Sequence, residues 1–142
     1  MITLRPVRSE DIRTIYEIRN HPQVRKNMFD SDEIAWEKHR SFWEKKLREG
    51  KSLCYMVTDG KEDIGLARLD PSGDAFEVDI LVSPKAQNKG IGSQALALLL
   101  EKAPVSSKII ARVKPDNAPS QRIFEKNGFR KKYVAFEYKK EK

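Results

Sequence analysis

The spacing of apolar residues changes twice along the chain and divides it into helical and extended segments. An extended segment is predicted at residues 2–7. Apolar residues then recur every three or four positions from Ser9, a good helix-capping residue, until the chain reaches Pro22. The residue before a proline is disfavoured from the α region, so this helix should end there. A second helix is predicted at residues 32–48.

After Gly50 the apolar residues alternate with polar ones, which is typical of strands. The pattern predicts three antiparallel strands within residues 52–83, joined by turns at 59–60 and 71–74. The later segments are a helix from Gly90, a strand at 108–113, a helix at 118–127 and a last strand at 133–138. The predicted class is α/β (α+β), a mixed sheet flanked by about four helices, in the order β-α-α-β-β-β-α-β-α-β.

Length and composition favour one folded unit. The chain has 142 residues, of which 39% are hydrophobic and 35% charged, a balance typical of a folded domain. A single domain over residues 1–142 is therefore expected. The longest strongly apolar run, Ala95 to Leu100, is far too short to span a membrane, and the first residues lack the apolar stretch of a signal peptide. We expect a cytoplasmic protein without a membrane partner.

Charge and chemistry narrow the choice of ligands. The net charge of +7 favours anionic partners, but the lysines are mixed with glutamates rather than gathered in a basic stripe, so nucleic acid is not the expected partner. Cys54 is the only cysteine, which excludes an intrachain disulfide and a cysteine metal cluster. With two histidines in the chain, no metal is expected.

A glycine-punctuated loop, "QNKGIGSQ", leads into the leucine-rich helix. Gly90 and Gly92 stand where the first turn of the helix leaves backbone N–H groups unpaired, and a turn without side chains lets a phosphate approach them. A dinucleotide fingerprint would need a third glycine at Ala95, and a P-loop would need a different spacing and a Lys-Ser/Thr end. The remaining pattern is Q-x-x-G-x-G.

This pattern, placed between the fourth strand and the third helix, resembles the pyrophosphate loop of the GNAT superfamily of acetyl-CoA-dependent N-acetyltransferases. A second segment, "DNAPSQRIFEKNGF", is similar to the family's N-x-x-S-x-x-x-[Y/F]-x-K-x-G-F motif, and the resemblance covers nearly the whole chain. It implies that acetyl-CoA is the co-substrate and that a primary amine attacks its thioester directly.

The resemblance also implies a coenzyme A site. The fourth strand would pair with the pantetheine arm, the loop amides would hold the pyrophosphate, and the start of the last helix would add polar contacts. Helix capping would equally explain Asn117 and Ser120. The residues assigned in this way are Leu81, Val82, Gln87, Asn88, Lys89, Gly90, Ile91, Gly92, Ser93, Asn117, Ser120 and Phe124.

Acetyl transfer needs a base for the ammonium and a donor for the oxyanion. Glu77 matches an acidic position of the family and Asp79 shares its strand face, although Glu77 also suits a plain solvent-facing residue. The backbone N–H of Leu81 is the expected oxyanion donor. Phe124 stands where many family members have a proton-donating tyrosine, which predicts weakened activity, and Tyr133 is a candidate replacement.

The N-terminal half should select the acceptor. The segment beginning "RNHP" resembles N-acetyltransferases that act on nucleotide-linked amino sugars, which implies a substrate site made of Arg19, Arg25, Met28, Phe29 and Trp36. Three alternatives stay open: a protein acetyltransferase acting on N-termini or side chains, a non-catalytic acyl-CoA sensor, and a nucleic-acid binder. The short C-terminal end leaves the acceptor side open or completed by a second copy in a homodimer.

Overall fold

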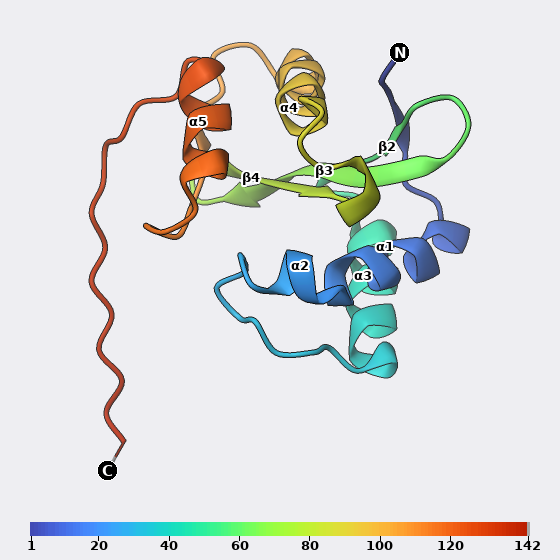
Figure 1. Ribbon diagram of the computed structural model, residues 1–142, viewed down its shortest axis with the longest axis horizontal. Coiled ribbons are helices and arrows are strands. Elements are labelled where there is room, and N and C mark those ends of the chain that lie inside the picture. The colour runs from blue at the N-terminus through green and yellow to red at the C-terminus, as the bar shows by residue number, and fades with distance from the viewer. Residues whose placement is uncertain (142) are drawn as a thin grey trace.

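A five-stranded mixed sheet forms the centre of the protein in a computed structural model that describes residues 1–141 (Figure 1). The strands lie in sequence order, with antiparallel pairing from β1 to β4 and parallel pairing between β4 and β5. Their bounds are β1 Thr3–Pro6, β2 Leu53–Thr58, β3 Asp63–Ser72, β4 Ala75–Val82 and β5 Ile109–Ile110.

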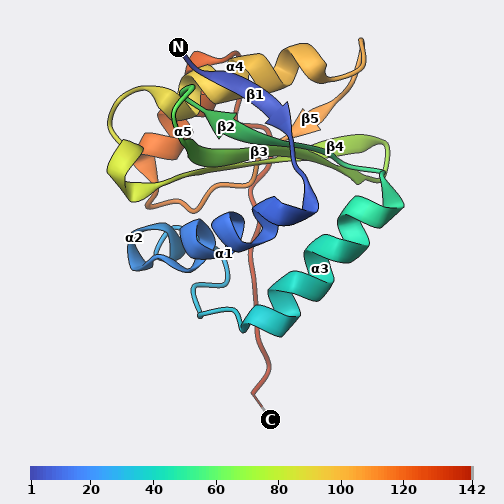
Figure 2. The same cartoon turned by 90° about the vertical axis from the view of Figure 1, so that its right-hand side faces the viewer.

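Helices cover both faces of the sheet (Figures 1 and 2). One face carries α1 (Ile12–Asn20), α2 (Pro22–Arg25) and α3 (Trp36–Glu49), and the other carries α4 (Ile91–Lys102) and α5 (Ala118–Lys126). The predicted α/β class and the order of the main helices are confirmed. The second predicted helix begins four residues late, at Trp36, and the single turn α2 was not predicted.

Alternation along the strands gives the sheet two separate cores. Val78 of β4 joins the core under α4, together with Leu96 and Leu99. Leu81 of β4 joins the core under α1 and α3, together with Ile15 and Trp43. Even-numbered side chains of β4 therefore face α4 and α5, and odd-numbered ones face α1 to α3.

Gly65 of β3 lies unusually close to β4. A Cβ atom added at this position would stand 2.4 Å from the carbonyl oxygen of Leu81. Glycine in a strand often marks such a close approach of two backbones. The separation of β3 and β4 near Leu81 therefore depends on the missing side chain.

The C-terminal segment departs from the prediction. The expected strand at 133–138 is not formed, and the chain from residue 130 runs away from the sheet as an extended tail (Figure 1). The strand predicted at 108–113 shrinks to Ile109–Ile110. A strand needs a paired neighbour to persist, and β5 offers only a two-residue edge.

Within the described range, no helix is long and apolar enough to cross a membrane.

A buried carboxylate anchors α1 to the sheet. Arg5 of β1 donates to both carboxylate oxygens of Asp11 at 2.8 Å and to Asp63 at 2.7 Å. The backbone N–H of Arg8 also donates to Asp11, at 2.7 Å. The hydrogen bonds from Arg5 hold the pKa of Asp11 below its usual 3.8, against the opposing effect of burial.

Replacing this carboxylate should destabilise the protein. Asp11→Asn is expected to lower the free energy of unfolding at neutral pH by about 1–3 kcal/mol, because Arg5 and the Arg8 amide lose a charged acceptor. The folded-state pKa lies below 3.8, so the contribution of Asp11 is present above that pH and is lost as the pH falls through the folded-state value. Urea unfolding at pH 7 and near pH 3 should show the difference from wild type shrinking in acid. The exposed Glu10→Gln is the control, and an equal loss in both variants would contradict the assignment.

Candidate active site

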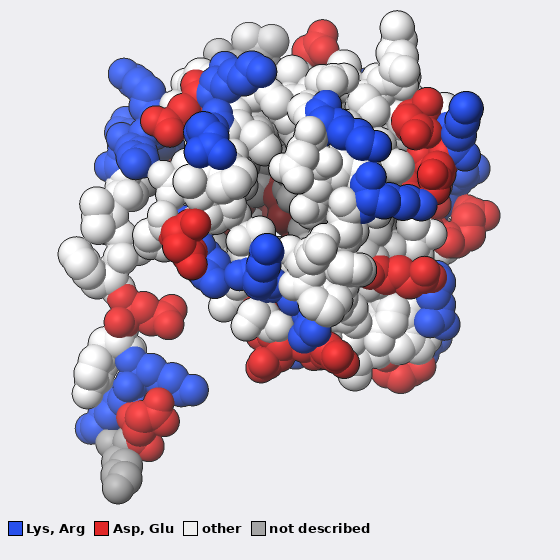
Figure 3. Space-filling model, in the orientation of Figure 1, with Lys and Arg blue, Asp and Glu red and all other residues white. Residues whose placement is uncertain are grey.

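The two strands that bound the candidate site separate soon after they meet. β4 and β5 pair only at Phe76 with Ile109 and at Glu77 with Ile110. β4 stays paired with β3 as far as Val82. Its other edge, from Val78 onward, has no partner strand among residues 1–141. Figure 3 shows this face hollowed near its centre, with an acidic side chain at the floor.

The direction of the β4 amides follows from two hydrogen bonds at its ends. The N–H of Phe76 donates to Lys108 beside β5 at 2.9 Å, whereas that of Ser83 donates to Ile64 at the end of β3 at 2.8 Å. Because successive peptide groups of a strand point to opposite sides, even-numbered amides face the opening and odd-numbered ones face β3. The N–H of Leu81 therefore points to β3, which corrects its assignment as oxyanion donor. Ile80 and Val82 present their amides to the opening.

The loop after β4 places the start of α4 beside this edge. Asn88 and Gly90 adopt left-handed conformations, with φ of 65° and 75°, and turn the chain into the helix. The amides of residues 91–93 form the first helical turn and have no partner within the helix, while Gln94 already bonds Gly90. These three N–H groups and the positive end of the helix dipole suit a polyanion.

The two loop glycines have different roles. Gly90 provides the left-handed turn, and its missing Cβ would meet only the side chain of Gln94, at 3.9 Å. Gly92 is buried, and a Cβ there would stand 3.1 Å from the side chain of Ile123 and 3.8 Å from that of Val82. Gly92 therefore makes room for α5 and β4 to pack against α4, and this packing role adds to the phosphate clearance that the sequence predicts.

Several residues predicted to bind coenzyme A, on α5 and on the loop before α4, also make contacts that stabilise the fold. The side chain of Asn117 accepts a hydrogen bond from the amide of Ser120 at 3.3 Å and caps the helix. Phe124 packs edge-on against Phe129 with ring centres 5.1 Å apart. Gln87 donates to the carbonyl oxygen of Val82 at 3.2 Å and ties the loop to β4. Lys89 is exposed on this loop.

The two candidate bases lie on the α1 to α3 face, and both are ion-paired. Glu77 meets the guanidinium of Arg112 at 3.1 Å. Asp79 accepts two hydrogen bonds from Arg68, at 3.1 and 3.3 Å, directly across the β3–β4 pair. Arg68 was missed in the sequence, although its alternation with Leu66 on the third strand placed it on this face.

A cavity of about 140 Å³ opens between this face and the helices. Arg19, Met28, His39, Arg68 and Asp79 are among its lining residues. His39, also missed in the sequence, places its Nε2 2.9 Å from the carbonyl oxygen of Ile12. Burial lowers the pKa of His39 below 6.5. A carbonyl only accepts, so the neutral ring carries its proton on Nε2.

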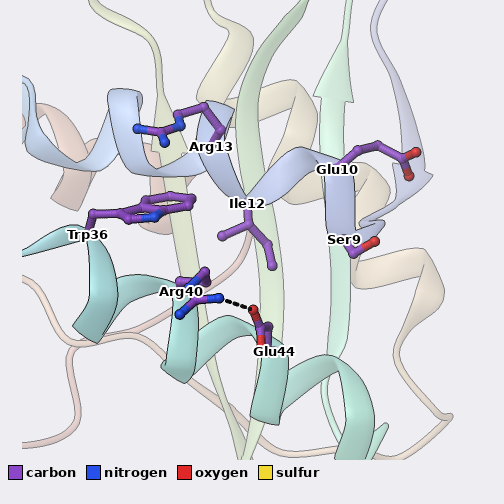
Figure 4. A pocket seen from close by; sticks show the side chains of 7 residues that line it. All are labelled: Ser9, Glu10, Ile12, Arg13, Trp36, Arg40 and Glu44. Atoms are coloured by element: carbon purple, nitrogen blue, oxygen red, sulfur yellow. Dashed lines mark ion pairs between the residues drawn. The ribbon is translucent and has the colours of Figure 1, made fainter.

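The predicted acceptor residues are only partly brought together. Arg19 and Met28 line this cavity. Arg25 instead donates to backbone carbonyls of its own region, and Phe29 is 70% exposed. Trp36 lies in a separate pocket of about 340 Å³, where the guanidinium of Arg13 stands 3.9 Å above its ring (Figure 4).

The chain matches the model of the acetyltransferase (GNAT) domain over residues 1–130. It is 24% identical over 134 residues to spermidine N(1)-acetyltransferase of Escherichia coli K12, covering 90% of this chain and 72% of that protein. Among solved structures it resembles spermidine N-acetyltransferase of Vibrio cholerae in complex with CoA and spermine, with a TM-score of 0.83, 22% identity, and 93% and 82% of the two chains covered.

The fold also resembles yncA of Salmonella typhimurium, solved with its cofactor acetyl-CoA, with a TM-score of 0.76, 23% identity, and 91% and 79% of the two chains covered. These structural likenesses confirm the fold. The family model reaches from the first strand past α5 and so includes both the open edge of β4 and the loop before α4. The chain belongs to the acetyltransferase (GNAT) domain family, as the sequence resemblance predicted.

Proposed function

We propose that this protein transfers the acetyl group of acetyl-CoA to the primary amine of a small molecule. The observation that carries the proposal is the open edge of β4, which leads directly to the free amides of the first turn of α4. Coenzyme A has an extended, amide-containing pantetheine arm that ends in a pyrophosphate. The arm suits the open edge of β4, and the pyrophosphate suits the free amides of α4. The acetyl-CoA bound to the Salmonella typhimurium relative supports the choice of ligand.

In the proposed complex the pantetheine arm pairs with β4 between Val78 and Val82 and brings the thioester beside Ile80. The pyrophosphate accepts hydrogen bonds from the amides of residues 91–93, and Lys89 adds positive charge at the loop. The N–H of Ile80, which faces the opening, takes the oxyanion role first assigned to Leu81.

The acceptor amine approaches from the cavity on the α1 to α3 face. A carboxylate first takes a proton from the ammonium, directly or through water, which frees the lone pair of the nitrogen. The nitrogen then bonds to the thioester carbonyl carbon and releases a second proton to solvent, while the carbon–sulfur bond breaks and CoA leaves as a thiolate. We assign the role of base to Asp79, because it lines the cavity and Glu77 does not, while each of the two carboxylates is paired with an arginine.

The side chain of Phe124 cannot donate a proton to the departing thiolate. Tyr133 is 65% exposed on the tail and is not among the cavity-lining residues. A thiol has a pKa of about 8.5, so thiolate leaves without a general acid and takes its proton from solvent. We therefore propose an active but slower enzyme rather than a non-catalytic sensor.

For the acceptor we propose a nucleotide-linked amino sugar. The support is the RNHP segment, which forms the end of α1 and the start of α2, and the position of Arg19 and Met28 in the cavity wall. Spermidine, named for the Escherichia coli relative, is the second candidate, supported by that relative and by the Vibrio cholerae structure with CoA and spermine.

We further propose a homodimer in which the tail adds to the sheet of a second copy. Val134, Phe136 and Tyr138 alternate along the tail, all more than 80% exposed, and one chain does not bury them. β5 is the edge strand of the sheet and offers an unpaired side to such a segment. The tail leads away from its own sheet, which favours a second copy over the same chain (Figure 1).

The base assignment predicts a difference between two isosteric variants. Asp79→Asn should lower kcat at saturating acetyl-CoA by about 10²-fold or more, because the ammonium loses its proton acceptor. Glu77→Gln should change kcat by less than about threefold, since Glu77 lies outside the cavity lining. The measurement is thiol release from acetyl-CoA with amino sugars as acceptors. A larger loss in Glu77→Gln would move the base to that residue.

The loop assignment predicts a charge effect on coenzyme binding. Lys89→Glu should raise the Kd of CoA about tenfold in calorimetry, because it places a negative charge beside the pyrophosphate. Lys61→Glu, equally exposed but on the β2–β3 turn, makes the same charge change and should leave the Kd unaltered. Equal effects of the two variants would point to a general change of net charge instead.

The dimer proposal predicts a mass of twice 16.4 kDa in light scattering. Phe136→Asp should shift the mass to that of the monomer, because a charge would be buried in the interface. Val105→Asp, at another exposed apolar residue, should not. A monomeric wild type would show that the tail pairs with its own sheet or with nothing.

A further inference from the structure

Building on the proposed acetyl transfer, we propose that the acceptor carries an anionic group, a phosphate or a carboxylate, close to its amine. Arg19 of α1 and Arg68 of β3 bind the anion inside the cavity, and Asp79 faces the amine. The proposal defines the chemical class of the acceptor, and it extends to compounds that are not nucleotide-linked sugars.

Arg19 is a half-buried cation without a close ion pair, although the carboxylates of Asp79 and Asp30 act on it from a longer distance. Within residues 1–141 no carboxylate oxygen lies within 4 Å of its guanidinium, and its one hydrogen bond runs from Nη2 to the backbone oxygen of Asp30 at 3.3 Å. Nη1 is buried with no hydrogen-bond partner. Burial also lowers the pKa of Arg19. Such a group costs free energy unless an anion compensates it.

Arg68 offers a second donor whose orientation is fixed. Nε and Nη2 bond Asp79, and Phe42 and Trp43 lie 5.5 and 5.3 Å from the guanidinium carbon. The remaining nitrogen, Nη1, is buried and has no partner, as in Arg19. Both arginines line the same cavity, so an anion that enters it lies beside both guanidinium groups.

The charges around the cavity leave a positive excess. Arg19 and Arg68 are the two cations among its lining residues, and Asp79 is the one carboxylate. Lys46 and Asp70, which lie outside the lining, pair with each other at 2.8 Å. An acceptor with a negative group would balance the site, whereas a polyamine would add repulsion. Guanidinium groups also suit phosphate and carboxylate better than ammonium groups do.

The position of the three side chains sets the distance between the two groups of the acceptor. Arg19, Arg68 and Asp79 line one cavity of about 140 Å³. The anion and the amine that they bind must therefore be close on the acceptor.

The test compares two amines that differ by one phosphate, phosphoethanolamine and ethanolamine, in thiol release from acetyl-CoA. The value of kcat/KM should be at least tenfold higher for phosphoethanolamine. Arg19→Met should remove that preference, because it should lower kcat/KM for phosphoethanolamine much more than for ethanolamine. Arg13→Met, on the same helix but beside the other pocket, is the matched control and should keep the preference.

Each outcome decides the question. Turnover without a preference for the phosphorylated amine, or better turnover of spermidine, would overturn the anion site while the acetyltransferase function stands. If no amine is acetylated, calorimetry of the CoA-loaded protein with phosphoethanolamine decides instead. Binding that is lost in Arg19→Met and kept in Arg13→Met supports the site and counts against turnover; no binding, or binding equal in both variants, rejects the site.

Discussion

The separation of β4 from β5 after two paired residues is the constraint on which the candidate site depends. Strand pairing would normally satisfy the backbone of β4 on both edges. Here the even-numbered amides beyond Phe76 face an opening, and the chain that follows Val82 starts a helix whose first amides are also unpaired. A ligand that is itself an extended chain with a polyanionic end satisfies both sets of donors, which is why one opening in the sheet suffices for a large coenzyme.

The alternation of β4 assigns the other groups to their places, and much of this could be predicted from the sequence. The two-residue period of residues 75–82 put Glu77 and Asp79 on one face, and the loop before α4 was identified from its glycines and spacing. These features are local, because they depend on neighbours along the chain. The family motif at 116–129 extended that local information to the far side of the opening.

The features that the sequence did not predict depend on contacts between distant segments. The direction of the Leu81 amide follows from its pairing with β3, and the role of Gly92 follows from Ile123 of another helix. Arg68 and His39 become site residues only when β3 and α3 meet at one cavity. The expected strand at 133–138 has the right alternation, but alternation supplies no partner strand.

The close approach at Gly65 restricts how this site can vary. Its φ is not left-handed, so the position requires glycine for space and not for conformation. The smallest side chain would meet the carbonyl oxygen of Leu81 and push apart the two strands that carry Arg68 and Asp79. A library aimed at new acceptors can therefore vary the helices around the cavity, while the strand spacing beneath it is fixed by a residue that touches no substrate.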